Sequence, residues 1–183
     1  MNATEPTRVA TTRSVTLGEL ALASRRLEAL DLPRFELTSS DFRDGDLLPT
    51  RATSDGDGSP PALSWEVSQL ARQPRAYALI CEDPDAPRAT PFVHWLVYGI
   101  GEQVRALDAN LVDLREGLNG GNEIGYAPAS PPAGSGRHRY HFQLFALDVE
   151  LSLAQGVDYD RLLSAMKGHI IAWSEIVGVY ERL

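Results

Sequence analysis

Hydrophobic residues over most of the chain come in short runs that are separated by glycine, proline, aspartate and serine. The longer runs are continuous rather than alternating, which is typical of strands buried on both faces. Strand-like runs occupy residues 35–37, 63–65, 76–81, 94–98, 140–147 and 176–180. A later apolar stripe at helical spacing predicts one helix over residues 160–172. Many short strands with frequent turn signals predict a mainly β fold, a β-sandwich of two antiparallel sheets, rather than a parallel sheet with alternating helices.

The chain up to residue 33 differs from the rest and is predicted to be an N-terminal extension to one domain, residues 34–183. Residues 1–15 are rich in threonine, arginine and asparagine and have almost no apolar content, so we expect them to be disordered. Thr16 begins a capping-box pattern, and the apolar positions after it predict a short amphipathic helix to about Leu30. This helix packs on the domain, or it contacts a second subunit in a homodimer or another partner.

Composition limits the possible functions. The chain has 183 residues, of which 43% are hydrophobic, and this length fits one domain with a single core. The net charge of −8 disfavours nucleic acid as a partner, because the surface repels a polyanion at long range. With Cys81 as the single cysteine an intrachain disulfide is excluded, and no apolar run approaches the roughly 18–20 residues of a transmembrane helix. We therefore expect a cytoplasmic protein.

Candidate binding or catalytic residues lie in three places where a predicted strand meets a loop. Asp83 and Asp85 belong to a stiff D-P-D-A-P segment, because proline fixes its own φ and biases the preceding residue toward extended backbone. His94 opens the next strand. His138 and Tyr140 follow a glycine-rich loop and share one strand face by alternation, so an imidazole and a phenol point the same way. Taken alone, each cluster is also typical of a structural turn or a satisfied polar group.

Taken in order, these motifs resemble the phosphatidylethanolamine-binding proteins, in the bacterial branch often called Raf-kinase-inhibitor-like. The resemblance extends from about residue 35 to residue 183. Its carriers are S-P-P-A-L-S-W at 59–65, D-P-D-A-P at 83–87, H-W at 94–95, P-P-A-G at 131–134, H-R-Y at 138–140, F-A-L-D at 145–148, K-G-H-I-I-A at 167–172 and G-V-Y at 178–180.

The resemblance implies a pocket for the phosphate of a phospholipid head group or a similar anion. The family's pocket residues correspond to Asp83, Asp85, His94, His138 and Tyr140. Imidazole, phenol and loop amide groups can all donate hydrogen bonds to an oxyanion. The aspartates are expected instead to orient the histidines or to meet an ammonium group.

We make a separate prediction for each of two loops. The resemblance implies a cis peptide bond between Ala86 and Pro87. After Tyr126 the loop departs from the family pattern, since Pro128 lacks an amide hydrogen and Ser130 stands where animal members commonly have glycine. We include Ser130 among the candidate ligand contacts, although this loop offers fewer backbone donors to an anion.

The leading hypothesis is a binding protein for a phosphate- or carboxylate-bearing small molecule or a phosphorylated partner side chain. The resemblance also suggests modulation of a protein kinase or a protease, which is an analogy at the level of the fold. A second hypothesis is an enzyme with a metal triad or a His–Asp acid–base pair. The sequence has no G-x-S-x-G, H-E-x-x-H or Cys–His nucleophile signature, and we expect no cofactor. A third hypothesis is an interaction protein that acts through its N-terminal helix.

Overall fold

The computed structural model describes residues 15–108 and 114–183. The disorder expected for residues 1–15 therefore falls, except for its last residue, outside the described residues. The chain order is α1 (Leu17–Leu20), α2 (Ala23–Arg26), β1 (Glu36–Thr38), a 3₁₀ turn η1 (Thr50–Ala52), β2 (Leu63–Glu66), β3 (Ala76–Asp83), β4 (Phe92–Gly101), β5 (Ala106–Leu107), β6 (Arg115–Glu116), β7 (His138–Leu147), α3 (Tyr159–Met166) and β8 (Ile170–Tyr180).

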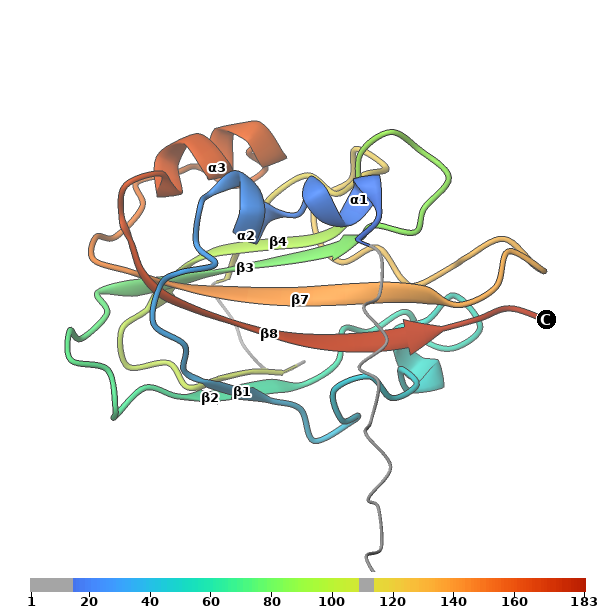
Figure 1. Cartoon of the computed structure of the whole chain (residues 1–183), viewed down its shortest axis with the longest axis horizontal. Coiled ribbons are helices and arrows are strands. Elements are labelled where there is room, and N and C mark those ends of the chain that lie inside the picture. Colours follow the sequence, from blue (N-terminus) through green and yellow to red (C-terminus); the bar gives the residue numbers. More distant parts are fainter. Residues whose placement is uncertain (1–14, 109–113) are drawn as a thin grey trace, which may run out of the picture.

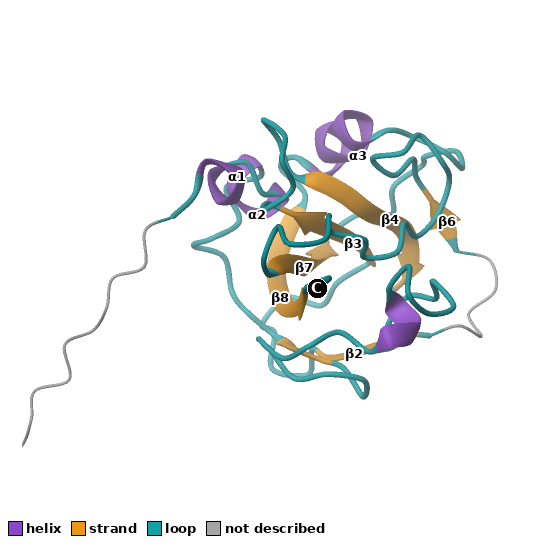
Figure 2. Cartoon of the chain, turned by 90° about the vertical axis from the view of Figure 1, so that its right-hand side faces the viewer, coloured by secondary structure: helices purple, strands orange, loops and turns teal. Residues whose placement is uncertain are grey.

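The strands form two packed sheets (Figure 1). The larger sheet has the order β6-β4-β3-β7-β8, and the smaller has the order β1-β2-β5. All of these strand pairs are antiparallel. Figure 2 looks along the strands and shows α1, α2 and α3 on one side of the larger sheet and β2 on the other. The prediction of a mainly β fold with two antiparallel sheets is confirmed.

The larger sheet is covered on both faces, which explains the continuous apolar run on its central strand, β3. On β3, Tyr77, Leu79 and Cys81 belong to the cluster that faces the smaller sheet. Ala78 and Ile80 belong to the cluster beneath the helices. Because side chains alternate along a strand, a strand covered on both sides buries successive side chains, which favours a continuous apolar run.

The last helix is shorter than predicted. α3 ends at Met166, and β8 begins at Ile170, which had been assigned to the helix. The helix ends because Gly168 adopts a left-handed conformation with φ of 82°, the usual role of glycine after a helix C-terminus. No helix in the described part of the chain is long and apolar enough to cross a membrane.

Residues 16–30, which we call the strap, form two four-residue helices rather than the single predicted helix. The capping box is present, since Thr16 and Glu19 exchange hydrogen bonds between side chain and backbone. The helix is interrupted because the amides of Ala23 and Ser24 donate to side chains of the larger sheet instead of to carbonyls one turn earlier. Tertiary contacts therefore override the local helical pattern.

Candidate functional site

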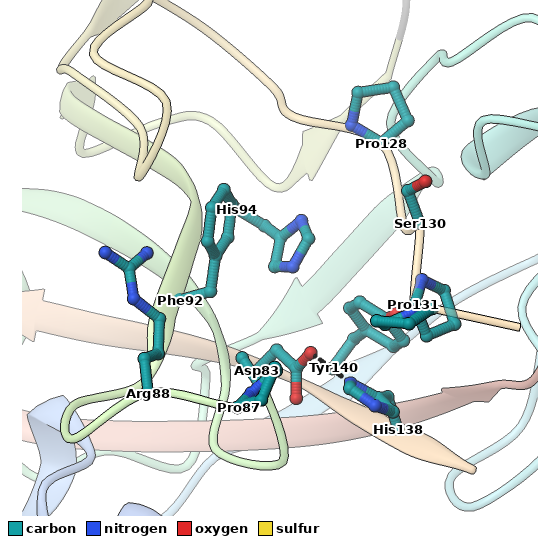
Figure 3. A pocket seen from close by; sticks show the side chains of 12 residues that line it. Asp83, Pro87, Arg88, Phe92, His94, Pro128, Ser130, Pro131, His138 and Tyr140 are labelled. Carbon is teal, nitrogen blue, oxygen red and sulfur yellow. Dashed lines mark hydrogen bonds and ion pairs between the residues drawn. The ribbon is translucent and has the colours of Figure 1, made fainter. Parts of the chain in front are cut away.

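A cavity of about 430 Å³ lies at one end of the larger sheet (Figure 3). Antiparallel pairing brings the end of β3 beside the starts of β4 and β7, so three strands contribute side chains to the same place. The loop after β3 and the proline-rich loop of residues 128–132 complete the walls. This volume is within the range of small-molecule sites.

The cavity contains five of the six side chains that the sequence predicts for the site: Asp83, His94, Ser130, His138 and Tyr140. Asp85 is the sixth, and it lies outside the lining. Its carboxylate accepts from Arg139 at Nε (2.7 Å) and at the backbone N (3.0 Å). Asp85 therefore fixes the loop after β3 to β7, on the face of β7 opposite His138 and Tyr140.

His138 is held in one orientation at the floor of the cavity (Figure 3). Its Nδ1 lies 2.7 Å from Oδ2 of Asp83 and must be the donor, because a carboxylate only accepts. The second oxygen of Asp83 accepts from the amide of Asp85 at 2.8 Å. Nε2 of His138 lies 3.1 Å from Oγ of Ser135, whose hydroxyl is within 2.7 Å of the Pro132 carbonyl. Asp83 thus has the orienting role expected for an aspartate of this site.

His94 presents the opposite chemistry. Its Nδ1 lies 2.7 Å from the carbonyl oxygen of Ala127, which only accepts, so Nδ1 carries the hydrogen. Burial lowers the pKa of His94, which favours the neutral ring. The remaining nitrogen, Nε2, then has a lone pair on a ring that points into the cavity (Figure 3). A neutral His94 offers an acceptor at Nε2, whereas the sequence reasoning had predicted a donor.

Tyr140 supplies an unused donor. Its hydroxyl is buried and has no hydrogen-bond partner within the described part of the chain. The ring lies edge-on to that of His94, with centroids 5.0 Å apart. Burial raises the pKa of Tyr140, so the phenol keeps its proton. A buried donor left unpaired costs about 1–3 kcal/mol, and an acceptor inside the cavity would remove that cost.

The wall formed by residues 126–132 is mainly apolar. Pro128, Pro131 and Pro132 have no amide hydrogen. The amides of Ala127 and Ala129 donate to the carbonyls of His94 and Ala52, so they are not directed at a ligand. The loop therefore provides mainly ring surface to the cavity. Ser130 keeps a polar role, since its Oγ accepts from Ser54 at 2.9 Å and its own hydrogen is available.

Arg88 stands at the mouth of the cavity, and the sequence reasoning did not single it out. The side chain is exposed, extends alongside Phe92 (Figure 3) and places its guanidinium 5.3 Å from the centroid of that ring. No carboxylate pairs with it in residues 15–108 or 114–183. Its position directly after D-P-D-A-P was the available signal.

The peptide bond between Ala86 and Pro87 is trans, so the implied cis bond is wrong. The loop instead turns tightly through a hydrogen bond from the amide of Arg88 to the carbonyl of Ala86, at 2.7 Å. A bond of this i to i+2 type closes a three-residue turn without a cis peptide.

The described residues contain no group of three or more histidine, cysteine, aspartate or glutamate side chains arranged to hold a metal ion. The metal-triad form of the enzyme hypothesis therefore has no supporting geometry in this part of the chain. Cys81 is fully buried, and burial raises the pKa of its thiol, so it is no candidate nucleophile.

Comparisons with known proteins agree with this fold. A family model described as phosphatidylethanolamine-binding protein matches residues 38–181. A UPF0098 protein of Chlamydia trachomatis is 40% identical over 152 residues, which cover 80% of this chain and 99% of that protein.

Solved structures of related proteins have the same fold. The crystal structure of a putative phosphatidylethanolamine-binding protein homologue from Chlamydia trachomatis has a TM-score of 0.74 at 39% identity, covering 82% of this chain and 99% of that one. E. coli YbcL, described as a new member of the mammalian family, has a TM-score of 0.75 at 27% identity, with the same coverage of both chains. The chain belongs to the phosphatidylethanolamine-binding protein family.

Proposed function

We propose that this protein binds a small phosphate-bearing molecule, a free phosphomonoester or a phospholipid head group, in the cavity at the end of the larger sheet. The observation that carries the proposal is the buried, unpartnered hydroxyl of Tyr140. It lies in the same cavity as His138, which Asp83 orients, and His94. A phosphate oxygen between these groups satisfies the phenol, and it accepts from Nε2 of His138 when both nitrogens of that ring carry hydrogens, because Nδ1 already donates to Asp83.

Cavity size alone does not select this site. A second cavity of about 480 Å³ lies between the strap, α3 and Arg88. Its buried carboxylate is already paired, since Glu82 accepts from Tyr159 at 2.6 Å, and Arg26 pairs with Asp160 at 2.9 Å. Arg88 and Thr90, which also line it, are exposed. Only the smaller of these two cavities offers a buried side-chain donor that still needs an acceptor.

The pairing of one donor with one acceptor points to a particular protonation state of the ligand. Tyr140 donates, whereas neutral His94 has only a lone pair to offer at Nε2. A phosphate monoanion matches this arrangement, because one oxygen accepts from the phenol and a P–O–H group donates to His94. Sulfate has no proton at neutral pH and leaves Nε2 facing an anionic oxygen. A site built to bond a substrate hydroxyl rejects analogues that lack it.

The outer part of the cavity suits the organic portion of the ligand. Proline rings and Phe92 supply apolar surface, and the guanidinium of Arg88 supplies one positive charge at the mouth. The phosphate itself therefore occupies the deep end beside Tyr140. Modulation of a protein kinase or a protease, which the family resemblance suggests, has no observation of its own in the described residues.

Titration calorimetry with inorganic phosphate, phosphoethanolamine and sulfate tests the proposal. We expect both phosphates to bind at least about tenfold more tightly than sulfate, the effect of one mismatched hydrogen bond worth about 1.4 kcal/mol. A phosphomonoester loses its second proton near pH 6, so phosphoethanolamine should bind more tightly as the pH falls from 7.5 to 5.5. Equal affinity for sulfate, or no binding of either phosphate, would contradict the proposal.

Vesicles that contain phosphatidylethanolamine separate the two sources of the phosphate. Binding to vesicles together with free phosphoethanolamine indicates a lipid head group. Binding of the free compound alone indicates a soluble phosphomonoester.

A further inference from the structure

The strap precedes the region that the family model matches, residues 38–181, yet it is anchored in the interior of the domain. The amide of Ala23 donates to Oε2 of Glu82 at 2.8 Å, and the amide of Ser24 donates to Oε1 of Gln143 at 2.9 Å. All four of these residues are buried. The strap thus lies on the face of the larger sheet that is turned away from the smaller sheet (Figures 1 and 2).

The N-terminal part of the strap contacts the loop of residues 83–88, and the other side of this loop lines the cavity. Gly18 is packed against Pro84, the residue between the two aspartates of D-P-D-A-P. A Cβ atom at Gly18 would lie 2.1 Å from the carbonyl oxygen of Pro84, far inside van der Waals contact. In Figure 1, α1 stands directly beside this loop. Any larger residue at position 18 must separate the strap from the loop.

Beside this contact, ionic and hydrogen-bonded side chains connect the strap to the cavity floor. Glu19 pairs with Arg139, and Arg139 pairs with Asp85 through Nε at 2.7 Å. The amide of Asp85 donates to Asp83 at 2.8 Å, and Asp83 accepts from Nδ1 of His138 at 2.7 Å. The side chains of Glu19, Arg139 and Asp85 are no more than 20% exposed, so water screens these ion pairs only weakly.

We propose that the strap is a positioning element of the ligand site. Gly18 and Glu19 hold the loop of residues 83–88 against the sheet, and through Arg139 and Asp85 they keep Asp83 and His138 in the orientation that binds phosphate. Pre-organised groups bind more tightly because the cost of ordering them is met before the ligand arrives. The effect on affinity rests on the proposed function, whereas the effect on the loop does not.

The sign of one substitution separates positioning from simple electrostatics. Glu19→Gln removes a negative charge from the neighbourhood of an anion site, so electrostatics alone predicts tighter phosphate binding. The positioning role predicts weaker binding, because Arg139 loses one of its two ionic partners. Glu28→Gln is the matched control: it removes the same charge from the same strap, and Glu28 is exposed and has no side-chain partner among residues 15–108 and 114–183.

Gly18→Ala tests the same idea without a change in charge. Alanine is a better helix former than glycine, so the variant does not weaken α1 itself. The added methyl group collides with Pro84 and moves the strap away from the loop. Agreement between two chemically different variants would assign the effect to the contact between strap and loop.

The experiment uses the full chain, with calorimetric titration of inorganic phosphate and hydrogen exchange of the Asp85 amide. We expect Glu19→Gln and Gly18→Ala each to weaken phosphate binding about threefold to tenfold, a usual size for coupling through a side-chain network. Both variants should also accelerate exchange at Asp85, whereas Glu28→Gln should change neither measurement by more than about twofold. In an Asp85→Asn background, Glu19→Gln should add little further loss, because the two residues act through one path.

The possible outcomes are distinct. If the wild-type chain binds phosphate and both strap variants bind it equally well or more tightly, the positioning role is overturned. If the wild-type chain does not bind phosphate, the proposed function fails, and the exchange rate of the Asp85 amide alone decides whether the strap holds the loop. Unchanged exchange in Gly18→Ala and Glu19→Gln then overturns the proposal. If one variant does not fold by circular dichroism, the other decides.

Discussion

Both faces of β7 are largely buried, but they differ in how their polar groups are satisfied. On the face toward the strap, Arg139 is paired with two carboxylates, and Gln143 bridges a strap amide and Glu82. On the face toward the cavity, the hydroxyl of Tyr140 has no partner in the described chain. One atom breaks the pattern, since Nε2 of His141 is buried on the strap side without a partner. Unmet hydrogen-bonding capacity beside a cavity, rather than burial, distinguishes a binding face from a structural one.

The difference has an energetic meaning. Paired polar groups on the strap face stabilise one arrangement of the chain, because breaking any of them leaves a buried group unsatisfied. The unpaired phenol on the cavity face has the opposite effect and costs stability until a ligand arrives. Binding sites commonly retain such unfavourable groups because function needs them. Substitutions on the two faces should therefore separate stability from ligand affinity.

The largest effect is expected on the strap face, from Glu82→Ala. The carboxylate of Glu82 accepts from the amide of Ala23, from Gln143 and from Tyr159. Its removal therefore leaves three buried donors without an acceptor. We expect the free energy of unfolding in urea to fall by about 3 kcal/mol. Glu36→Ala, at an exposed position without a side-chain partner in the described chain, should change it by less than about 0.5 kcal/mol. A loss below about 1 kcal/mol for Glu82→Ala would contradict the structural role of this face.

On the cavity face, His138→Ala should weaken phosphate binding about tenfold to a hundredfold. This corresponds to the 1.5–3 kcal/mol typical of a hydrogen bond to a charged group. The matched control is His141→Ala, which removes the same side chain from the opposite face of the same strand. His141 pairs with Glu175 at 3.0 Å and lies outside the cavity. It should lower stability and change affinity by less than about twofold. Equal losses of affinity in the two variants would remove the functional distinction between the faces.

A pH effect on stability tests the state of His94. Burial lowers the pKa of His94 in the folded chain below its ordinary value of 6.5, so the unfolded chain binds the proton more tightly. The contribution to stability is therefore complete above about pH 6.5 and is lost as the pH falls through the folded pKa. The loss is at most about 1.4 kcal/mol per pH unit. His94→Gln should show a flatter urea midpoint between pH 7.5 and 5.5, and parallel curves for the two proteins would refute a neutral His94.

Local patterns predict the fold well because burial on both faces produces a continuous apolar run in the sequence. Every residue of β3 from Ala76 to Cys81 is apolar, since the smaller sheet and the helices cover opposite faces. No local sequence pattern indicates the break between α1 and α2. It depends on Glu82 and Gln143, which are 59 and 119 residues away from the strap amides that they bind. A pattern of helical spacing contains no information about such distant acceptors.

In the site, too, some features follow from the sequence and others do not. Strand alternation places His138 and Tyr140 on one face and Arg139 on the other, so these positions follow from the sequence. The direction of each hydrogen bond does not. That His94 donates to the carbonyl of Ala127 and that Asp85 turns to Arg139 are consequences of how loops meet in space. The residue types identified the site, but only the three-dimensional contacts show which groups are free to bind a ligand.

The smallest effect concerns a single oxygen atom. Tyr140→Phe and Tyr77→Phe each remove a buried hydroxyl that has no partner in the described chain, but Tyr77 lies outside the cavity. Each change should raise the free energy of unfolding by up to about 1 kcal/mol, because an unsatisfied buried donor is removed and the ring is kept. Only Tyr140→Phe should also weaken phosphate binding, by about threefold to tenfold, since a neutral donor contributes about 0.5–1.5 kcal/mol. Urea denaturation and phosphate calorimetry on both variants separate the two effects. Undiminished phosphate affinity in Tyr140→Phe would mean that this hydroxyl does not meet the ligand, and the distinction between the two faces of β7 would then rest on His138 alone.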